Sequence, residues 1–442
     1  MTRVAFLSEH ASPAALLGGV DAGGQNVYVD EVSRGLARLG YAVDVFTRCE
    51  AAGARQVIDW APGVRIINLR VGPDRAVPKD ELWPLMPAFR DAVLHFATQQ
   101  DVRYDVIHGN FWMSGWVATE LRRSLGVPAV QIFHAMGLTK RREQGDADTS
   151  PTDRIEIERE IVRGADRLIA QCSAEEAELV DDYGADPAKV AVIPSAVDVR
   201  AFAPVSRETA RRRIGLATDG PVVVYVGRML PRKDVRNVVR ALSILKRGAE
   251  ASGANSVVPL LLLVGGETIE PDPVLTPEIG ELERLAMELG VADHVRFAGR
   301  RRRDELRFYY GAGDVTVTTP WYEPFGLTPL EAMACGRPVI GSSVGGIGFT
   351  VVDGETGFLV PPRDPEALAG RLVQLLSQPG LAARMGHAAR ARVEGAFTWP
   401  MVATRTAALY ESLLTDRAMA APSVSPWLNA TGLALSATTD HG

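Results

Sequence analysis

The sequence predicts an α/β protein in which two Rossmann-like, doubly wound domains face a central cleft. Three observations support this prediction. The chain has 442 residues, which is too long for one ordinary hydrophobic core. Short apolar runs alternate with helical patterns from end to end, as in parallel sheets covered on both faces. The pattern restarts at Pro221, which indicates a second sheet.

The first half of the chain contains seven apolar runs rich in Val, Ile and Phe. The strands expected there are residues 4–7, 42–46, 64–69, 106–108, 129–133, 168–170 and 190–193. The helices expected between them are residues 25–39, 84–99, 113–125, 153–163 and 174–183. Because parallel strands carry their ligands beyond their carboxyl ends, the polar residues that follow these runs are the candidates for a site.

The second half repeats this alternation. Its expected strands are residues 222–226, 260–264, 295–298, 315–318 and 338–341. Its expected helices are residues 235–246, 277–289, 304–310, 329–334 and 364–376. We predict a first domain at 1–203, a second at 204–400, a terminal helix at 401–417 that packs back on the first domain, and a disordered tail at 418–442 that is rich in Ala, Ser and Thr.

Composition excludes several classes of protein. The chain is 46% hydrophobic and 23% charged, as globular proteins are. A formal charge of −6 argues against nucleic-acid binding, which needs a basic footprint. Three widely spaced cysteines match neither a disulfide framework nor a metal site and favour a reducing cytoplasm. The apolar runs have the length of strands, so no stable membrane insertion is expected. A homodimer is compatible with the sequence.

The most informative segment lies after the expected strand at 315–318. Glu323 falls in a loop, Pro329 suits an early helical position, Glu331 falls on the first turn of that helix, and Gly336 is placed to end it. Helix N-terminal amides attract phosphate, and carboxylates accept hydrogen bonds from sugar hydroxyls. A surface loop before a charged helix is the alternative, but the apolar and small flanking residues favour a packed segment.

The stretch Glu323-Pro-Phe-Gly-Leu-Thr-Pro-Leu-Glu331 is similar to the two-glutamate motif of glycosyltransferase family 4, which consists of retaining enzymes with the GT-B fold. The resemblance covers residues 1 to about 414. It implies that Glu331 holds the ribose hydroxyls of a nucleotide and that Glu323 contacts hydroxyls of the donor sugar. It also implies that backbone amides support the diphosphate and the sugar, and these belong to Phe325, Gly326, Leu327 and Thr328.

Two basic residues and a histidine extend this donor site. Arg228 directly follows the strand at 222–226, and Lys233 precedes the next helix, where cations would stabilise a departing diphosphate. The small residue expected after Lys233 is replaced by Asp234. His134 follows the strand at 129–133 and would point into the cleft. By the resemblance, Arg228 and Lys233 grip the donor phosphates and His134 lies near the reacting carbon, so the catalytic residues expected are His134, Arg228, Lys233 and Glu323.

A glycine-rich loop occupies residues 18–26, between the first strand and the first helix. Such a loop lets backbone amides approach an anion, but it does not match the dinucleotide pattern of nicotinamide enzymes. It is similar to the loop of sucrose-phosphate synthases and of the inositol-phosphate glycosyltransferases of mycothiol synthesis. The resemblance assigns Gly24 to the donor diphosphate, and Gly23, Gln25 and Asn26 to the acceptor.

Three cations of the first half match positions that hold the acceptor phosphate in one or both of those relatives. They are Lys79, Lys140 and Arg154, which could otherwise lie on a solvated face. In the inositol-phosphate branch a Tyr and a Thr complete the pocket, whereas Phe111 and Ala135 stand here. This departure disfavours inositol phosphate as the acceptor. The basic run at 300–303 is interpreted as solvated.

The expected reaction transfers a hexose, with glucose from UDP-glucose preferred, to a hydroxyl of a sugar or sugar phosphate with retention by front-side displacement. The resemblance implies no metal and no cofactor, and no Asp-x-Asp cluster is placed to hold a metal. The alternative is a UDP-GlcNAc-dependent inositol-phosphate glycosyltransferase, which would accept only 1L-myo-inositol 1-phosphate. A nucleotide-sugar epimerase would turn over the donor without an acceptor, and a silent sugar-binding protein would release no nucleotide.

Overall fold

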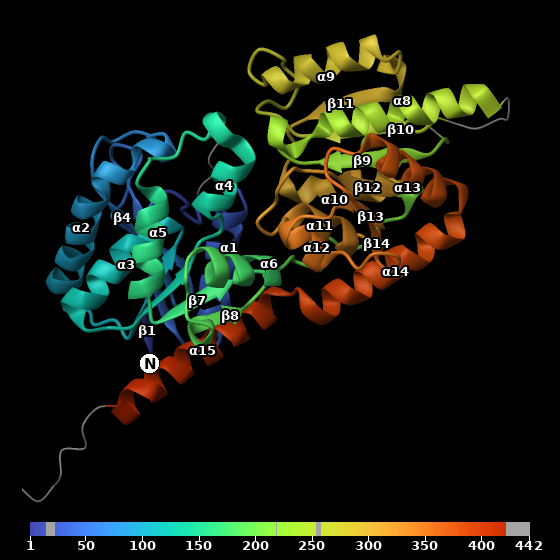
Figure 1. Cartoon of the computed structure of the whole chain (residues 1–442). Coiled ribbons are helices and arrows are strands. Elements are labelled where there is room, and N and C mark those ends of the chain that lie inside the picture. Colours follow the sequence, from blue (N-terminus) through green and yellow to red (C-terminus); the bar gives the residue numbers. More distant parts are fainter. Residues whose placement is uncertain (15–22, 218, 253–257, 421–442) are drawn as a thin grey trace, which may run out of the picture.

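The computed structural model describes residues 1–14, 23–217, 219–252 and 258–420. Two α/β domains lie side by side, with the N-terminal half of the chain forming one and most of the C-terminal half the other (Figure 1). The prediction of two doubly wound domains is confirmed. Each sheet separates two apolar cores, one on each face, because its strands are buried on both sides.

The first sheet has eight strands in the order β3-β4-β2-β1-β5-β6-β7-β8. Their bounds are Arg3–Leu7 (β1), Ala42–Arg48 (β2), Val57–Ala61 (β3), Val64–Leu69 (β4), Val106–Asn110 (β5), Ala129–Ile132 (β6), Arg167–Ala170 (β7) and Val190–Val192 (β8). All neighbouring strands are parallel except β3, which pairs antiparallel with β4. Strand β3 was not predicted, because this partly exposed edge strand lacks the continuous apolar run of its buried neighbours.

The helices of the first domain cover both faces of this sheet. They are Gly24–Arg38 (α1), Met86–Gln99 (α2), Trp112–Leu125 (α3), Gly137–Gln144 (α4), Arg154–Gly164 (α5) and Ser173–Ala177 (α6), which continues as a π-helical turn over Glu178–Asp182. Helix α4 was not predicted, since Gly137 is its one buried residue and it has no apolar face. It lies on the side of the first domain that faces the second (Figure 1).

The second sheet has six strands, all parallel, in the order β11-β10-β9-β12-β13-β14. They are Val222–Val226 (β9), Leu260–Val264 (β10), Val295–Gly299 (β11), Val315–Thr318 (β12), Val339–Ser342 (β13) and Gly357–Val360 (β14). The helices are Arg207–Arg213 (α7), Val235–Ser252 (α8), Pro277–Glu288 (α9), Arg303–Ala312 (α10), Leu327–Ala334 (α11), Gly345–Thr350 (α12), Pro365–Ser377 (α13) and Pro379–Ala396 (α14). Strand β14 and helices α7, α12 and α14 were not predicted.

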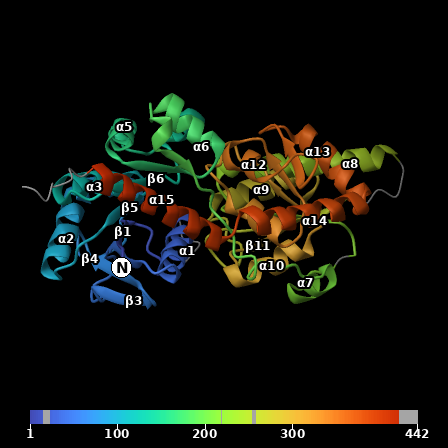
Figure 2. The ribbon, with the colours of Figure 1, turned by 90° about the horizontal axis from the view of Figure 1, so that it is seen from below.

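The last helix, α15 (Trp399–Ala420), leaves the second domain and runs across the first (Figures 1 and 2). It packs against α1 so closely that a Cβ atom at Gly35 would lie 2.6 Å from the Cβ of Ala403. The buried Tyr410 hydroxyl also lies 2.5 Å from His108 Nδ1 on β5. The helix expected at 401–417 is therefore slightly longer, and residues 421–442 of the expected tail lie outside the described residues.

Candidate active site

Two glycines position the loop between β12 and α11, Gly326 within the loop and Gly346 of α12 packed against it. Gly326 adopts φ +86° at the start of α11, a conformation that favours glycine. Gly346 N–H donates to Glu323 O at 3.1 Å, and a Cβ atom at Gly346 would lie 2.2 Å from Phe325 Cα. A side chain at Gly346 would therefore collide with the loop, which fixes Glu323 and Phe325 at the carboxyl end of β12.

Glu323 forms an ion pair with Lys233, which joins the motif of α11 to the segment after β9. Both side chains are mostly buried, with 14% of Glu323 and 16% of Lys233 exposed. Burial lowers the pKa of Lys233, against the attraction of Glu323. For Glu323, burial acts to raise the pKa, but Lys233, Arg232 and Arg228 outweigh it, so its pKa lies below the usual value. The surrounding cations thus favour the charged form of Glu323, whereas burial acts against the charge of Lys233.

Glu331 lies one turn into α11, because the helix begins at Leu327 and not at Pro329. Glu331 therefore lies about half a turn further into the helix than predicted and is not on its first turn, whereas Gly336, at φ +70°, ends the helix as expected. Tyr310 donates its hydroxyl to Glu331 at 2.9 Å, and Arg303 lies 3.8 Å away. Burial raises the pKa of Glu331, against the opposing effects of Arg303 and Tyr310.

The basic run at 300–303 is not simply solvated, which corrects the sequence interpretation. Arg303 interacts with Glu331 and lies 5.5 Å from the centre of the Phe202 ring. Arg301 donates to Tyr309 Oη and to Ile269 O. Arg302, by contrast, is 80% exposed. The chain direction after β11 thus places the guanidinium groups of Arg301 and Arg303 against the domain.

The segment after β9 contains a cation that sequence reasoning missed. Arg228 follows the strand as expected, and its carbonyl accepts a hydrogen bond from Tyr225 Oη at 3.0 Å. The guanidinium of Arg232 lies 5.2 Å from the centre of the Tyr322 ring, and its Nη1 is buried with no hydrogen-bond partner among the described residues. Arg232 thus adds a third positive charge beside Glu323. It could have been suspected because it directly precedes Lys233.

His134 faces Asn110 across the ends of β6 and β5, with 3.2 Å between His134 Nε2 and Asn110 Oδ1. Its ring also meets Tyr28 of α1 edge-on at 4.9 Å. Burial lowers the pKa of His134 to about 3, and the nearby His108 and His10 contribute further. The imidazole is therefore neutral at pH 7 and serves as a hydrogen-bonding group rather than a cation.

Three non-glycine residues of the site adopt positive φ angles, which cost of order 1–3 kcal/mol each. They are Phe111 at 76°, His134 at 60° and Asp234 at 50°. Phe111 directly follows β5, His134 lies two residues after the end of β6, and Asp234 directly follows the turn at Pro231–Lys233. The left-handed backbone at Asp234 explains why a small residue was expected there, and aspartate tolerates this conformation better than most residues. Such strain is typical of functional sites.

The described part of the glycine-rich loop begins at Gly23, so residues 18–22 lie outside the described residues. Gly24 approaches the second domain, since a Cβ atom there would lie 3.3 Å from Leu327 Cδ1. Gln25 Nε2 donates to Ser8 Oγ at 3.3 Å. Asn26 accepts from Gly23 N–H and donates to Ser12 O, both at 2.9 Å, so its side chain fastens the loop.

Two of the three cations assigned to the acceptor phosphate meet at the ring of Phe111, and the third, Lys140, is linked to Arg154 through Ser150. Lys79 Nζ lies 5.6 Å and the Arg154 guanidinium 5.1 Å from the centre of the Phe111 ring. Arg154 is 2% exposed and donates to Ala135 O at 2.7 Å and to Glu158 at 2.8 Å. Lys140 Nζ lies 2.8 Å from Ser150 Oγ, which also accepts from Arg154. Arg154 is thus not on a solvated face.

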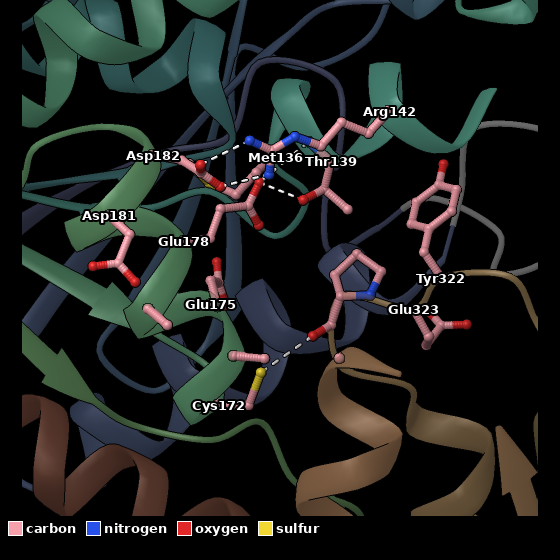
Figure 3. Close-up of a pocket in the computed structure, with 14 residues that line it drawn as sticks. Met136, Thr139, Arg142, Cys172, Glu175, Glu178, Asp181, Asp182, Tyr322 and Glu323 are labelled. Carbon is pink, nitrogen blue, oxygen red and sulfur yellow. Dashed lines mark hydrogen bonds and ion pairs between the residues drawn. The ribbon is translucent and has the colours of Figure 1, made fainter. Parts of the chain in front are cut away.

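A cavity of about 410 Å³ opens between the domains beside this site (Figure 3). The first domain lines it with acidic side chains, and the second with the loop at 322–324. The acidic residues are Glu175, Glu178, Asp181 and Asp182. Glu323 also lines the cavity, and Figure 3 shows that its carboxylate points away from these acidic residues. Burial raises the pKa of Glu175 to about 8.

Three residue pairs along the cavity wall are held by hydrogen bonds or an ion pair. Glu178 accepts a hydrogen bond from Thr139 N–H at 3.2 Å, and Asp182 pairs with both terminal nitrogens of Arg142 at 2.7 Å. Cys172 Sγ donates to Pro324 O at 3.6 Å, which joins the domains. The acidic residues were missed because they follow β7 within a helix and read as an ordinary charged helix start.

The paired parallel-sheet domains, with a carboxylate–cation site at the carboxyl ends of the strands, define a glycosyltransferase of the GT-B class. The profile of glycosyl transferases group 1 matches residues 206–392, and that of the glycosyl transferase 4-like domain matches residues 23–196. The chain belongs to this family. The protein is accordingly a hexosyltransferase of the retaining type that is typical of family 4.

Similar proteins carry two different names. A D-inositol 3-phosphate glycosyltransferase of Streptomyces scabiei is 38% identical over 417 residues, 94% of this chain and 92% of the relative. One of Acidothermus cellulolyticus is 39% identical, over 95% of this chain and 92% of the relative. The solved sucrose-phosphate synthase of Thermosynechococcus elongatus is 35% identical, with a TM-score of 0.84, covering 94% of this chain and all of that one.

Neither a metal site nor a membrane span emerges where the structure can be described. Among residues 1–14, 23–217, 219–252 and 258–420, no three His, Cys, Asp or Glu side chains are grouped to hold a metal ion. In the same ranges, no helix combines the length and apolar character that crossing a bilayer requires. Independence from a metal stays a prediction.

Proposed function

We propose that the protein transfers glucose from UDP-glucose to a hydroxyl of a phosphorylated sugar, with retention of the anomeric configuration. The observation that carries the acceptor half is that Lys79 and Arg154 meet at Phe111, while Lys140 shares Ser150 with Arg154. Three cations within reach of one another suit a phosphate dianion, and two of them already donate to Ser150 or to a backbone carbonyl. The name of the sucrose-phosphate synthase relative supports a phosphorylated product.

The donor half rests on the carboxylates of α11 and the cations after β9. Glu331 would accept hydrogen bonds from the ribose hydroxyls in place of Tyr310. Lys233, Arg228 and Arg232 would face the diphosphate, whose growing negative charge they stabilise as the bond to the sugar breaks. The diphosphate would then compete with Glu323 for Lys233, which would free Glu323 to accept from the sugar hydroxyls.

The chemistry itself falls to the substrates, with the protein supplying orientation and charge. The acceptor hydroxyl would attack from the side of the leaving phosphate, which accepts the hydroxyl proton as the glycosidic bond forms. Neutral His134, fixed by Asn110, would hold a donor-sugar hydroxyl or the acceptor in line. A nucleophilic carboxylate is not needed in this scheme, and no metal is invoked. The three cysteines, all free and buried, agree with a cytoplasmic location.

The second candidate is a UDP-GlcNAc-dependent transfer to 1L-myo-inositol 1-phosphate, the compound also called D-inositol 3-phosphate. The names of the bacterial relatives favour it. Phe111 and Ala135 oppose it, because they lack the hydroxyl groups that complete the pocket in that branch.

A matrix of UDP-sugars and acceptors, with products identified by mass spectrometry, tests both candidates. We expect product from UDP-glucose with fructose 6-phosphate and little or none with fructose. Product from 1L-myo-inositol 1-phosphate alone would replace the first candidate by the second. Donor turnover without any acceptor would indicate epimerase or hydrolase chemistry instead.

A further inference from the structure

Helix α4 is a polar helix held in place by side-chain hydrogen bonds to neighbouring elements. On one side, Thr139 and Arg142 bind Glu178 and Asp182 of the π-helical turn. On another, Lys140 binds Asp148 and Ser150 at 2.9 and 2.8 Å. Because Gly137 is the one buried residue of α4 and Leu138 is its one apolar side chain packed against the core, the position of this helix depends largely on these polar partners.

The C-terminal end of α4 contacts the second domain. Gln144 Nε2 donates to the hydroxyl of Tyr322 at 2.5 Å. The ring of Tyr322 stacks under the Arg232 guanidinium, and Tyr322 directly precedes Glu323 in the chain. Burial raises the pKa of the Tyr322 hydroxyl, so it remains protonated and can both donate and accept. This hydroxyl therefore joins α4 to the cations of the donor site.

Lys140 and Gln144 lie on the same face of α4, because residues four apart are stacked one turn, about 5–6 Å, from each other. Lys140 shares Ser150 with the buried Arg154. One turn of a rigid helix thus separates the cation set proposed for the acceptor phosphate from the residue that contacts Tyr322.

We propose that Tyr322 and Gln144 are positioning residues that couple occupancy of the acceptor-phosphate site to the alignment of the donor loop. The inference rests on the proposed function, since it takes Lys140 to bind the acceptor phosphate. A phosphate that draws Lys140 away from Asp148 sets the position of α4, and Gln144 passes this position to Tyr322. Tyr322 then holds Arg232 and the adjacent Glu323 in the arrangement that the diphosphate and sugar require.

The test compares Tyr322→Phe, which removes the hydroxyl but keeps the ring against Arg232, with Gln144→Ala and the double variant. A neutral hydrogen bond contributes about 0.5–1.5 kcal/mol, which corresponds to a factor of about 2–13. We expect each single variant to raise KM for the phosphorylated acceptor by about three- to tenfold. The affinity for UDP measured without acceptor should stay within twofold. The acceptor KM of the double variant should be no higher than that of the more impaired single variant.

Tyr41→Phe is the matched control, because Tyr41 Oη also reaches another element, Ala407 O of α15, but lies away from the site. Its kinetics should equal those of the wild type. Gln144→Glu should restore the acceptor KM, since a carboxylate accepts from the Tyr322 hydroxyl. Thermal unfolding of each variant separates a folding defect from a kinetic one. Gln144 belongs to the first domain and Tyr322 to the second, so a local folding defect in one domain would not explain a loss seen in both single variants.

Several results would overturn the inference. Additive losses in the double variant would show that Tyr322 and Gln144 act independently. If UDP affinity falls equally with and without acceptor, the Gln144–Tyr322 contact has only a structural role. An unchanged acceptor KM in both single variants, with an active wild type, would refute the coupling alone. Failure of the wild type with every phosphorylated acceptor would instead refute the proposed function, and the coupling with it.

Discussion

Replacing Phe111 by Tyr and Ala135 by Thr should move acceptor preference toward inositol phosphate. The two positions lie where the phosphate is expected. The Phe111 ring is 5.1 Å from the Arg154 guanidinium, and the carbonyl of Ala135 accepts from Arg154 Nη2 at 2.7 Å. A hydroxyl added at either position therefore enters the reach of a phosphate held by Arg154.

The size of the effect follows from the charge of the acceptor. A hydrogen bond to a charged group contributes about 1.5–3 kcal/mol, and 1.4 kcal/mol is a factor of ten. Each substitution should thus improve kcat/KM for 1L-myo-inositol 1-phosphate by about ten- to a hundredfold, and the double variant by about a hundredfold or more. The measurement is initial-rate kinetics with UDP-glucose and with UDP-GlcNAc, for this acceptor and for fructose 6-phosphate.

A matched control is available in the second domain. Phe308 lies 4.7 Å from Arg307 and 5.9 Å from Arg213, so Phe308→Tyr adds the same hydroxyl beside two guanidinium groups away from the site. This variant should leave kcat/KM unchanged for both acceptors. The reasoning is refuted if the double variant folds with normal UDP affinity and still gains less than threefold with inositol phosphate. The reasoning is also refuted if kcat/KM for unphosphorylated inositol rises as much as kcat/KM for inositol phosphate.

Three further predictions concern single carboxylates and their partners. Lys233→Ala should lower kcat about 10²–10³-fold in product assays and the free energy of unfolding in urea by about 2–3 kcal/mol, because Glu323 keeps a mostly buried charge. Glu331→Ala should weaken UDP binding about 10- to 100-fold by calorimetry, and an unchanged affinity would remove Glu331 from the ribose site. Glu175 has a pKa of about 8 when folded against 4.5 unfolded, so its stabilising effect is present below pH 4.5 and lost as the pH rises through 8. Glu175→Gln should therefore gain stability relative to the wild type between pH 5 and pH 8.5, by up to about 5 kcal/mol in urea titrations.

Elements with an apolar pattern could be predicted from the sequence, because burial on a sheet or against it leaves a periodic trace. The runs at 64–69, 222–226, 260–264 and 315–318 coincide with strands in the structure. Helix α4 left no such trace, since its sequence Gly-Leu-Thr-Lys-Arg-Arg-Glu-Gln has no apolar face. Its side chains bind acidic partners at 178–182, which sequence order alone does not bring near it.

The candidate site shows the same division. Residues just beyond the ends of strands, such as His134 and Arg228, could be predicted from the rule that ligands meet the carboxyl ends of parallel strands. Their partners could not, because Asn110 and Tyr310 are placed beside the site by other strands and helices. Arg303 was misinterpreted as solvated for that reason, as only the fold brings it to Glu331.

The path of α15 has a consequence for how the chain folds during synthesis. The first domain is discontinuous, because residues near the C-terminus complete the apolar surface that α1 and β5 begin. Val402, Ala403 and Tyr410 are buried there. A ribosome-bound chain therefore finishes the second domain while the first still lacks this helix. A chain cut before Trp399 would leave an apolar strip of the first domain exposed, whereas the same fragment with residues 399–420 supplied as a separate peptide should regain a closed surface.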